Sequence, residues 1–276
     1  MPRLITLGAL FGLSLNVWAW STLDDWAAIV VTQLRSRQPL PALSTYGAGL
    51  DVASAYTVQH QVLDELTTND TITGFRASLT RPLGQVRFKV REPVTSAVLH
   101  SGLLRGTATL KLHDFKRLQI APALGYVLKV AIVKRLNDLK ELDAVIGSVV
   151  PVVDFSNYDF ERETEWRGED LIAANGAFVA LLVGKPLAAI DATAVNSVLM
   201  ELTRDGQVID RGRAVNVMGN QYTALYWLIN RLLDQGWTLR PGTVLVTGPL
   251  SDPVPAKPGK HIARYWEASD VTFTVE

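Results

Sequence analysis

Cysteine is absent from the 276-residue sequence. Its absence excludes disulfide bonds, cysteine-ligated zinc, iron–sulfur clusters and thiol catalysis. An excess of either charge is also missing, with 27 Lys and Arg residues against 27 Asp and Glu residues. A neutral chain exerts no global attraction on nucleic acid, so we expect no nucleic-acid partner. The sequence also lacks a G-x-G-x-x-G after a strand, a Walker loop and a G-x-S-x-G.

The apolar content is high enough for a sizeable core. Hydrophobic residues make up 48% and charged residues 20% of the chain, which is typical of globular proteins. The length suits one large domain or two smaller ones. Disordered chains and small stapled scaffolds are therefore excluded.

Residues 1–19 have the pattern of a secretory signal peptide. Arg3 provides the positive charge, residues 4–15 form an apolar run, and Val17 and Ala19 occupy the −3 and −1 positions of a small-residue cleavage site. The run is too short to span a bilayer, which takes about 20 residues. The alternative is an N-terminal strand or helix buried in the fold. We expect removal of residues 1–19, and a periplasmic or secreted protein with no membrane span after processing.

The order of the expected elements favours an α+β fold. Apolar residues at helical spacing predict two early helices, and alternating or continuous apolar runs predict many strands after them. Strands that follow helices in this way argue against a doubly wound parallel sheet. The expected helices are residues 23–35, 52–66, 136–146 and 221–233; the expected strands are 85–90, 97–112, 122–133, 149–155, 176–184, 244–247, 271–275 and a hairpin of 198–204 with 207–214.

Three further features each allow a functional and a structural interpretation. His100 and His113 could meet across strands, or they could be ordinary surface histidines. The acidic stretch 154–170 could bind a hard cation, or it could be a solvated loop. Gly219, before a helix, could help to bind an anion, or it could simply join a loop to a helix.

Short segments spread over residues 51–276 form an ordered set that is more specific than any one of them. They are Ala55-Tyr56-Thr57-Val58-Gln59, Gly74-Phe75-Arg76-Ala77-Ser78-Leu79-Thr80, Ile172-Ala173-Ala174-Asn175-Gly176-Ala177 and a C-terminal series of Gly212, Gly219, Ala224, Trp227, Gly236, Leu239, Gly242 and Val246-Thr247-Gly248. In order and spacing they resemble the 2-keto-4-pentenoate hydratase branch of the fumarylacetoacetate hydrolase superfamily.

This resemblance implies an α+β fold with a fumarylacetoacetate hydrolase-like mixed β-roll or sandwich and a smaller N-terminal helical region. We expect an N-terminal α/β region over residues 20–100 and the hydrolase-like C-terminal domain over residues 101–276. The superfamily's habit of oligomerising implies a homo-oligomer.

The resemblance also implies a metal site that this sequence has altered. In the family, an E-x-E pair and a third carboxylate hold Mg²⁺ or Mn²⁺, which chelates a 2-oxo acid. Here Ala121 and Ala123 stand at the paired positions, and Asp154 stands at the third. Arg76 replaces the family's strand lysine, and it cannot give up a proton near neutral pH. We therefore expect no metal ligands and no cofactor, with Ala121, Ala123 and Asp154 converging on one pocket.

The resulting functional expectation is an exported 2-keto-4-pentenoate hydratase-like protein that binds a small 2-oxo or carboxylic acid. The expected ligand-binding residues are Arg76, His100, Asp154 and Asn175, and no catalytic residue is assigned. Loss of two metal ligands predicts a pseudoenzyme or an altered activity. The alternative is an active hydratase or related lyase that acts on 2-hydroxy-dienoates.

Overall fold

The computed structural model describes residues 22–46, 49–162, 164–187, 192–266 and 269–276. Residues 1–21, which include the predicted signal peptide, lie outside this part of the chain. Among the helices in the described ranges, none has the length and apolar character needed to cross a membrane.

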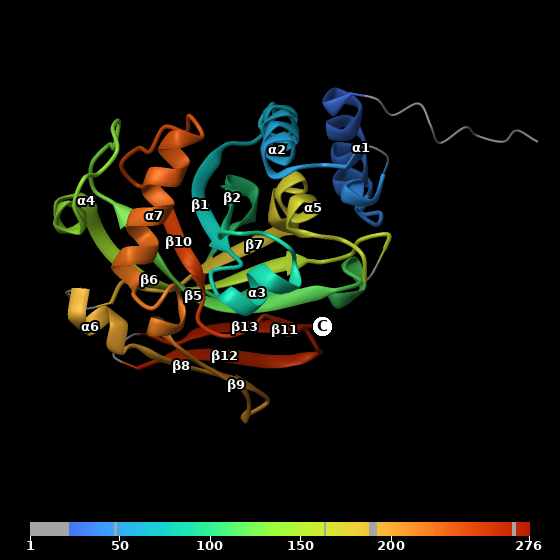
Figure 1. The fold of residues 1–276 in the computed structure, drawn as a ribbon. Coiled ribbons are helices and arrows are strands. Elements are labelled where there is room, and N and C mark those ends of the chain that lie inside the picture. Colours follow the sequence, from blue (N-terminus) through green and yellow to red (C-terminus); the bar gives the residue numbers. More distant parts are fainter. Residues whose placement is uncertain (1–21, 47–48, 163, 188–191, 267–268) are drawn as a thin grey trace, which may run out of the picture.

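Two β-sheets form the body of the molecule (Figure 1). The larger sheet has eight strands in the order β2-β1-β10-β5-β6-β7-β3, with β11 paired to β5. The smaller has the order β4-β13-β12-β8-β9. The strands are β1 Ile72–Ser78, β2 Val94–Leu99, β3 Leu103–Arg105, β4 Ala108–Leu110, β5 Leu118–Leu128, β6 Ile146–Asn157, β7 Phe178–Val183, β8 Leu199–Arg204, β9 Gln207–Arg213, β10 Val244–Pro249, β11 Val254–Pro255, β12 Gly259–Tyr265 and β13 Val271–Val275.

The smaller sheet packs against one face of the larger one. The Phe155 and Phe273 rings meet edge to face with centroids 5.0 Å apart, and the Tyr265 hydroxyl donates to the Val152 carbonyl at 2.5 Å. The larger sheet curls, so that its other face has an apolar interior of its own. Val98, Val152, Leu181 and Val246, from four different strands, belong to this buried cluster. The predicted β-roll or sandwich is thus the observed architecture.

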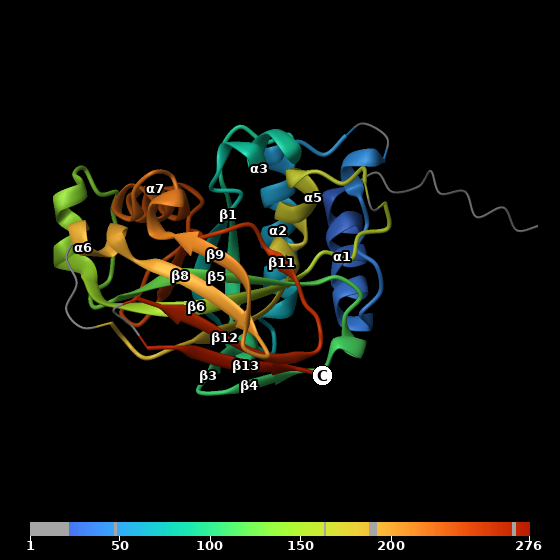
Figure 2. The ribbon, with the colours of Figure 1, turned by 90° about the horizontal axis from the view of Figure 1, so that it is seen from below.

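Helices α1 (Leu23–Ser36), α2 (Val52–Leu66) and α5 (Gly168–Ala173) group together at one end (Figure 2). The starts of α1 and α2 are capped, since Thr22 accepts from Asp25 N and Asp51 accepts from Ser54 N. The Gln59 side chain links α2 to β2 and α5, because its Nε2 donates at 2.9 Å to the carbonyls of both Thr95 and Ile172. These contacts hold the helical group against β2.

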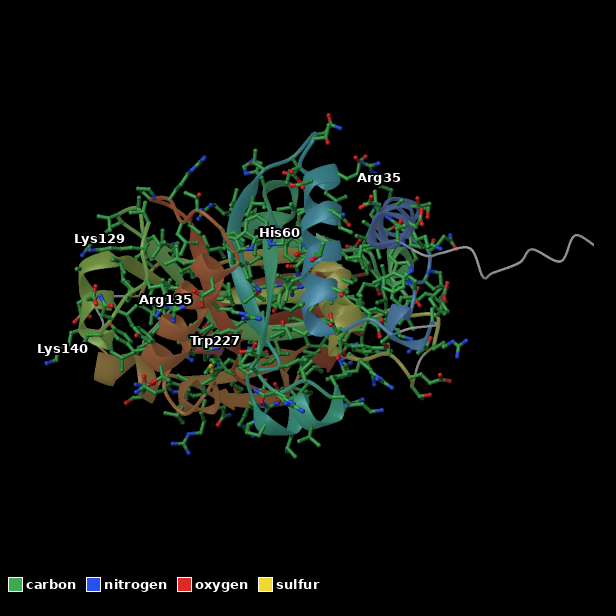
Figure 3. All side chains as sticks on the ribbon, turned by 45° about the horizontal axis from the view of Figure 1, so that its top comes forward. Arg35, His60, Lys129, Arg135, Lys140 and Trp227 are labelled. Carbon is green, nitrogen blue, oxygen red and sulfur yellow. The ribbon has the colours of Figure 1, made fainter. Side chains whose placement is uncertain are left out.

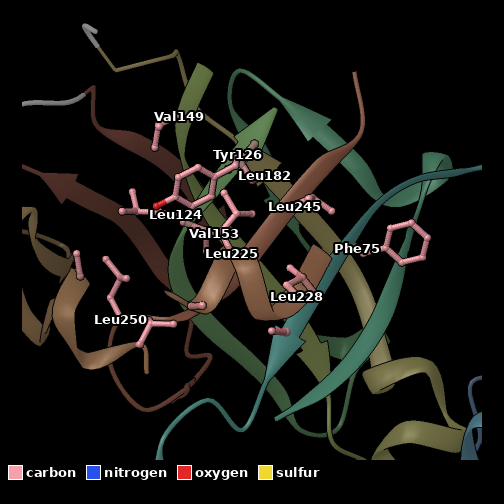
Figure 4. Close-up of a cluster of buried hydrophobic side chains, with 14 of the residues drawn as sticks. Phe75, Leu124, Tyr126, Val149, Val153, Leu182, Leu225, Leu228, Leu245 and Leu250 are labelled. Atoms are coloured by element: carbon pink, nitrogen blue, oxygen red, sulfur yellow. The ribbon is translucent and has the colours of Figure 1, made fainter. Parts of the chain in front are cut away.

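Helix α7 (Gln221–Asp234) packs its apolar side on the larger sheet. Leu225 and Leu228 of this helix lie among Tyr126, Val153 and Leu245 of the strands (Figure 4). Asn220 caps the helix by accepting from the backbone N–H groups of Tyr222 and Thr223. The remaining helices are short: α3 Pro82–Arg87, α4 Leu142–Val145, α6 Ala192–Ser197 and the 3-10 turns η2 Leu43–Thr45, η3 His100–Gly102, η4 Leu112–Asp114, η5 Leu139–Glu141, η6 Asn175–Ala177 and η7 Ala214–Asn216.

Two sequence-based expectations about the fold need comment. The strand predicted over 85–90 is wrong, because α3 covers residues 85–87 and a turn follows it. Pro82 in the first turn of α3 has a backbone angle already suited to a helix. The expected boundary near residue 100 does not separate two sheets, since β1 and β2 lie in the same sheet as β5 and β10.

Buried His261 on β12 predicts a loss of stability in acid. Its ring stacks on Phe273, its Nδ1 lies 3.1 Å from the Gly259 carbonyl oxygen, and its Nε2 has no partner within the described residues. Burial lowers the pKa of His261. Below pH ~6.5 the unfolded chain therefore takes up a proton that the folded chain resists, so stability falls with the pH.

The His261→Gln variant should lose less stability than the wild-type protein between pH 7 and about 5.5, because it lacks this proton uptake. Urea unfolding at both pH values measures the difference. His60 is present in both proteins, so its titration cancels in the comparison. Equal pH dependence in the two proteins would show that His261 is protonated without cost.

Candidate functional site

Arg76 lies at the centre of β1 and points into the interior of the curled sheet. Its strand pairs antiparallel with β2 and parallel with β10, which sets Arg76 opposite Ser96 on one side and Val246 on the other. Although it is an arginine, the residue is only 1% exposed. A buried guanidinium requires a counter-charge and hydrogen-bond acceptors.

The acceptors come from β6 and from η6, the turn that leads into β7. The Arg76 Nη1 lies 2.5 Å from Asp154 Oδ2 and donates to Ser156 Oγ at 2.8 Å. The Arg76 Nη2 donates to the Gly176 carbonyl oxygen at 2.6 Å. The guanidinium carbon also lies 5.1 Å from the centre of the Phe178 ring. A buried ion pair between β1 and β6 is the result.

Ala121 and Ala123 lie next to this pair, as expected from the sequence. Ala121 is directly opposite Asp154 in the β5–β6 register, and Ala123 is opposite Val152. Residues two apart on a strand point to the same face, and so do directly opposed residues. Ala121, Ala123 and Asp154 therefore share the inner face that also holds the guanidinium.

Burial dominates the electrostatics of the site. It raises the pKa of the Asp154 carboxyl, and the Arg76 guanidinium offsets part of this rise. Burial likewise raises the pKa of Tyr158, whose hydroxyl is hydrogen-bonded to Ser156. Tyr158 therefore stays neutral, and its hydroxyl lies within the electrostatic reach of the ion pair.

Three polar atoms around the pair have no partner among the described residues: Arg76 Nε, Asp154 Oδ1 and Ser96 Oγ. All three residues are at least nine-tenths buried, with exposures of 1%, 8% and 3%. Leaving a buried donor or acceptor unpaired costs about 1–3 kcal/mol. Such a set indicates a place for a small polar molecule, either water or a ligand.

The other two expected ligand-binding residues are placed differently. Asn175 is buried, but its amide is already used: Oδ1 accepts from Ala97 N at 2.7 Å and Nδ2 donates to Ala97 O at 3.1 Å. It thereby fastens η6 to β2. His100 is exposed on η3, beyond the end of β2. It interacts electrostatically with Asp70.

Sequence reasoning missed Ser96, Ser156 and Tyr158. Ser156 follows Asp154 by two residues on β6, so the period of a strand could have marked it as sharing the same face. Ser96 depends on the pairing of β1 with β2, and no feature of its own sequence indicates that register.

The side chains at the site do not fit a cation held by three carboxylates. No cluster of three or more His, Asp or Glu residues suited to a metal occurs in the described ranges. Asp154 is the carboxylate present, and Arg76 already binds it. Glu161 of the acidic stretch accepts a hydrogen bond from the Tyr46 hydroxyl instead.

No family model matches the chain, but individual proteins do. A 2-keto-4-pentenoate hydratase of Paraburkholderia phymatum is 23% identical over 237 residues, covering 85% of this chain and 90% of that protein. The 4-oxalocrotonate decarboxylase of Pseudomonas putida G7, complexed with magnesium and adipate, has a TM-score of 0.85 at 18% identity, over 92% of this chain and 97% of that one. The chain is similar in sequence to the 2-keto-4-pentenoate hydratases and shares the fold of the fumarylacetoacetate hydrolase superfamily. This similarity confirms the resemblance and the fold class predicted from sequence.

A more distant superfamily structure shares the fold. The fumarylpyruvate hydrolase of Pseudomonas aeruginosa, in complex with Mn²⁺ and pyruvate, has a TM-score of 0.57 at 12% identity, over 73% of this chain and 88% of that one. The decarboxylase is also known in complex with calcium and acetate. The expectation of no cofactor is therefore corrected: proteins with this superfamily fold bind divalent metals.

Proposed function

We propose that this 2-keto-4-pentenoate hydratase-like protein binds a small carboxylic or 2-oxo acid beside Arg76. The observation that supports this function is the set of three unpaired, buried polar atoms, Arg76 Nε, Asp154 Oδ1 and Ser96 Oγ. Solvent reaches the edge of this set, because the Asp154 residue is 8% exposed and the Ala121 residue is 7% exposed.

The donors and acceptors match a small acid. Arg76 Nε and the Ser96 hydroxyl can both donate to a ligand carboxylate, and a hydrogen bond from a guanidinium to a carboxylate is among the stronger kinds. Asp154 Oδ1 can accept a hydrogen bond only from a ligand that carries a hydroxyl, such as the enol form of a 2-oxo acid. The acids bound by the structural relatives, adipate, acetate and pyruvate, belong to the same chemical class.

An active hydratase or lyase on 2-hydroxy-dienoates is the second candidate function. It is supported by the similarity of the chain to a 2-keto-4-pentenoate hydratase and a 4-oxalocrotonate decarboxylase over most of their length. Because the described residues do not fit the family's three-carboxylate metal site, we derive no reaction step for this chain.

Thermal unfolding with added sodium acetate, pyruvate or adipate tests the binding proposal. A ligand that binds only the folded protein stabilises it by about 2.7 kcal/mol at one hundred times its dissociation constant. We expect at least one acid to raise the melting temperature. The Ser96→Ala variant should fold and show a smaller rise, because it removes one donor.

Arg105→Ala provides the matched control, since Arg105 is an exposed arginine on β3. It should respond to the acids as the wild-type protein does. Equal shifts in wild-type and Ser96→Ala protein would place acid binding elsewhere. Parallel measurements with EDTA, Mg²⁺ or Mn²⁺, and an assay of 2-hydroxypenta-2,4-dienoate loss, distinguish binding from turnover. Metal-dependent turnover would favour the second function.

Export and self-association are further parts of this proposal. N-terminal sequencing of the mature protein should begin at or near Trp20, and sedimentation should give a mass above that of one chain. An intact Met1 on a protein that stays in the cytoplasm would contradict export.

A further inference from the structure

A cavity of about 690 Å³ lies at the amino ends of the neighbouring parallel strands β1 and β10. Its walls are the segment that leads into β1 and the segment between α7 and β10. Phe75 lines the cavity and Arg76 does not, and successive residues of a strand point to opposite faces. The cavity is therefore separate from the site beside Arg76. Its volume falls in the range of about 300–1,000 Å³ typical of ligand sites.

Two aromatic rings give the cavity an apolar surface in a fixed position. The Trp237 indole stacks on His60 with centroids 4.3 Å apart, and it is tilted against Phe75 at 5.2 Å. His60 lies on α2, on the side facing β1 (Figure 3). Burial lowers the pKa of His60, which favours the neutral ring in this stack. A partly exposed indole held in this way offers a rigid apolar contact with a polar N–H at its edge.

The charged groups of the lining are one carboxylate and one guanidinium, Asp70 and Arg240. Burial alone would raise the pKa of Asp70, but hydrogen bonds from Ser101 and Thr71 outweigh it and hold the pKa below its usual value. Asp70 is thus an acceptor only. The Arg240 guanidinium is a donor only, and no ion pair of it is found within the described ranges.

Threonine hydroxyls fill the rest of the polar lining. Thr71 and Thr238 are exposed, and Thr243 Oγ1 accepts from Arg240 N, which leaves its own proton free to donate. Each hydroxyl can donate and accept. A matching ligand must therefore donate hydrogen bonds at Asp70, accept them at Arg240, do both at the threonines and present an apolar face to Trp237.

We propose that this cavity is a binding site for a neutral saccharide, of one or two sugar rings. A sugar has vicinal hydroxyls that donate and accept, carries no charge and has an apolar C–H face. An amino acid would also satisfy Asp70 and Arg240, but it is small for 690 Å³ and would not reach all of the Thr71, Thr238 and Thr243 hydroxyls.

Saturation-transfer NMR and calorimetric titration with D-glucose, N-acetyl-D-glucosamine and cellobiose test the proposal. We expect at least one of these sugars to bind with a dissociation constant of about a millimolar or lower. Arg240→Ala and Thr238→Val should each weaken binding by about tenfold or somewhat less, because each removes a hydrogen bond at an exposed position. Arg105→Ala and Ser96→Ala should bind the sugar like the wild-type protein.

The outcomes separate this proposal from acid binding beside Arg76. No saturable binding of any of the three sugars up to about 50 mM would overturn it. So would sugar binding that Arg240→Ala leaves unchanged, or glycine and glutamine binding in preference to the sugars. Loss of acid binding in Ser96→Ala with intact sugar binding would support two independent sites.

Discussion

Replacing Arg76 with methionine should cost about 3–5 kcal/mol of unfolding free energy. The variant fills similar space but leaves Asp154 buried without its partner. Urea unfolding, followed by circular dichroism, measures the change. The double variant Arg76→Met with Asp154→Leu should regain most of the loss, because it removes the unpaired charge as well.

The loss should also depend on pH. Without Arg76, the folded-state pKa of Asp154 rises further above its unfolded value, so the folded variant binds more protons than the unfolded one. Stability then falls as the pH rises through the unfolded value near 4 towards the folded one. The cost of Arg76→Met should therefore be smaller at pH 4 than at pH 7. A pH-independent cost, or a double variant as unstable as the single one, would contradict a buried ion pair.

Gly74→Ala should destabilise the protein by about 3 kcal/mol or prevent its folding, since overpacking costs about 1–3 kcal/mol before any hydrogen bond is lost. A Cβ at Gly74 would collide with the backbone carbonyl of Val244 and lie 3.3 Å from the Val244 Cβ. The carbonyl belongs to the neighbouring strand, so relief requires that β1 and β10 move apart.

Gly84→Ala is the matched control for this substitution. Gly84 lies in α3, and an added Cβ there would have ordinary contacts at 3.5 Å and beyond. Alanine favours the helical state, so we expect an effect between none and a gain of about 1 kcal/mol. Urea unfolding curves of both variants measure the two changes in unfolding free energy. A harmless Gly74→Ala would mean that β1 and β10 are not as closely paired as described.

The expected α2 and the hairpin of β8 with β9 could be predicted because their signals are local. Asp51 is a helix cap beside its helix, and Asp205-Gly206 is a turn between its two strands. The alternation of apolar and charged residues over 85–90 wrongly predicted a half-buried strand. In the structure Val86 lies on α3, is 77% exposed and does not face the core.

The candidate site was predictable only in part, for a similar reason. Arg76 and Asp154 were identified through a family resemblance, and the structure brings them into contact. Ser96 could not be identified, because its place depends on the register of β2 against β1. His100 was expected nearby, but β2 ends one residue before it, and η3 leads it to the surface.

The parallel pairing of Gly74 with Val244 also has a consequence for how the protein folds. The strand that covers one edge of β1 is made almost at the end of synthesis, so a nascent chain lacking β10 leaves β1 and β5 without a common neighbour. Such long-range pairing slows folding and prolongs the exposure of unpaired strand edges. We therefore expect fragments that end before β10 to aggregate, and refolding to slow steeply when this pairing is weakened.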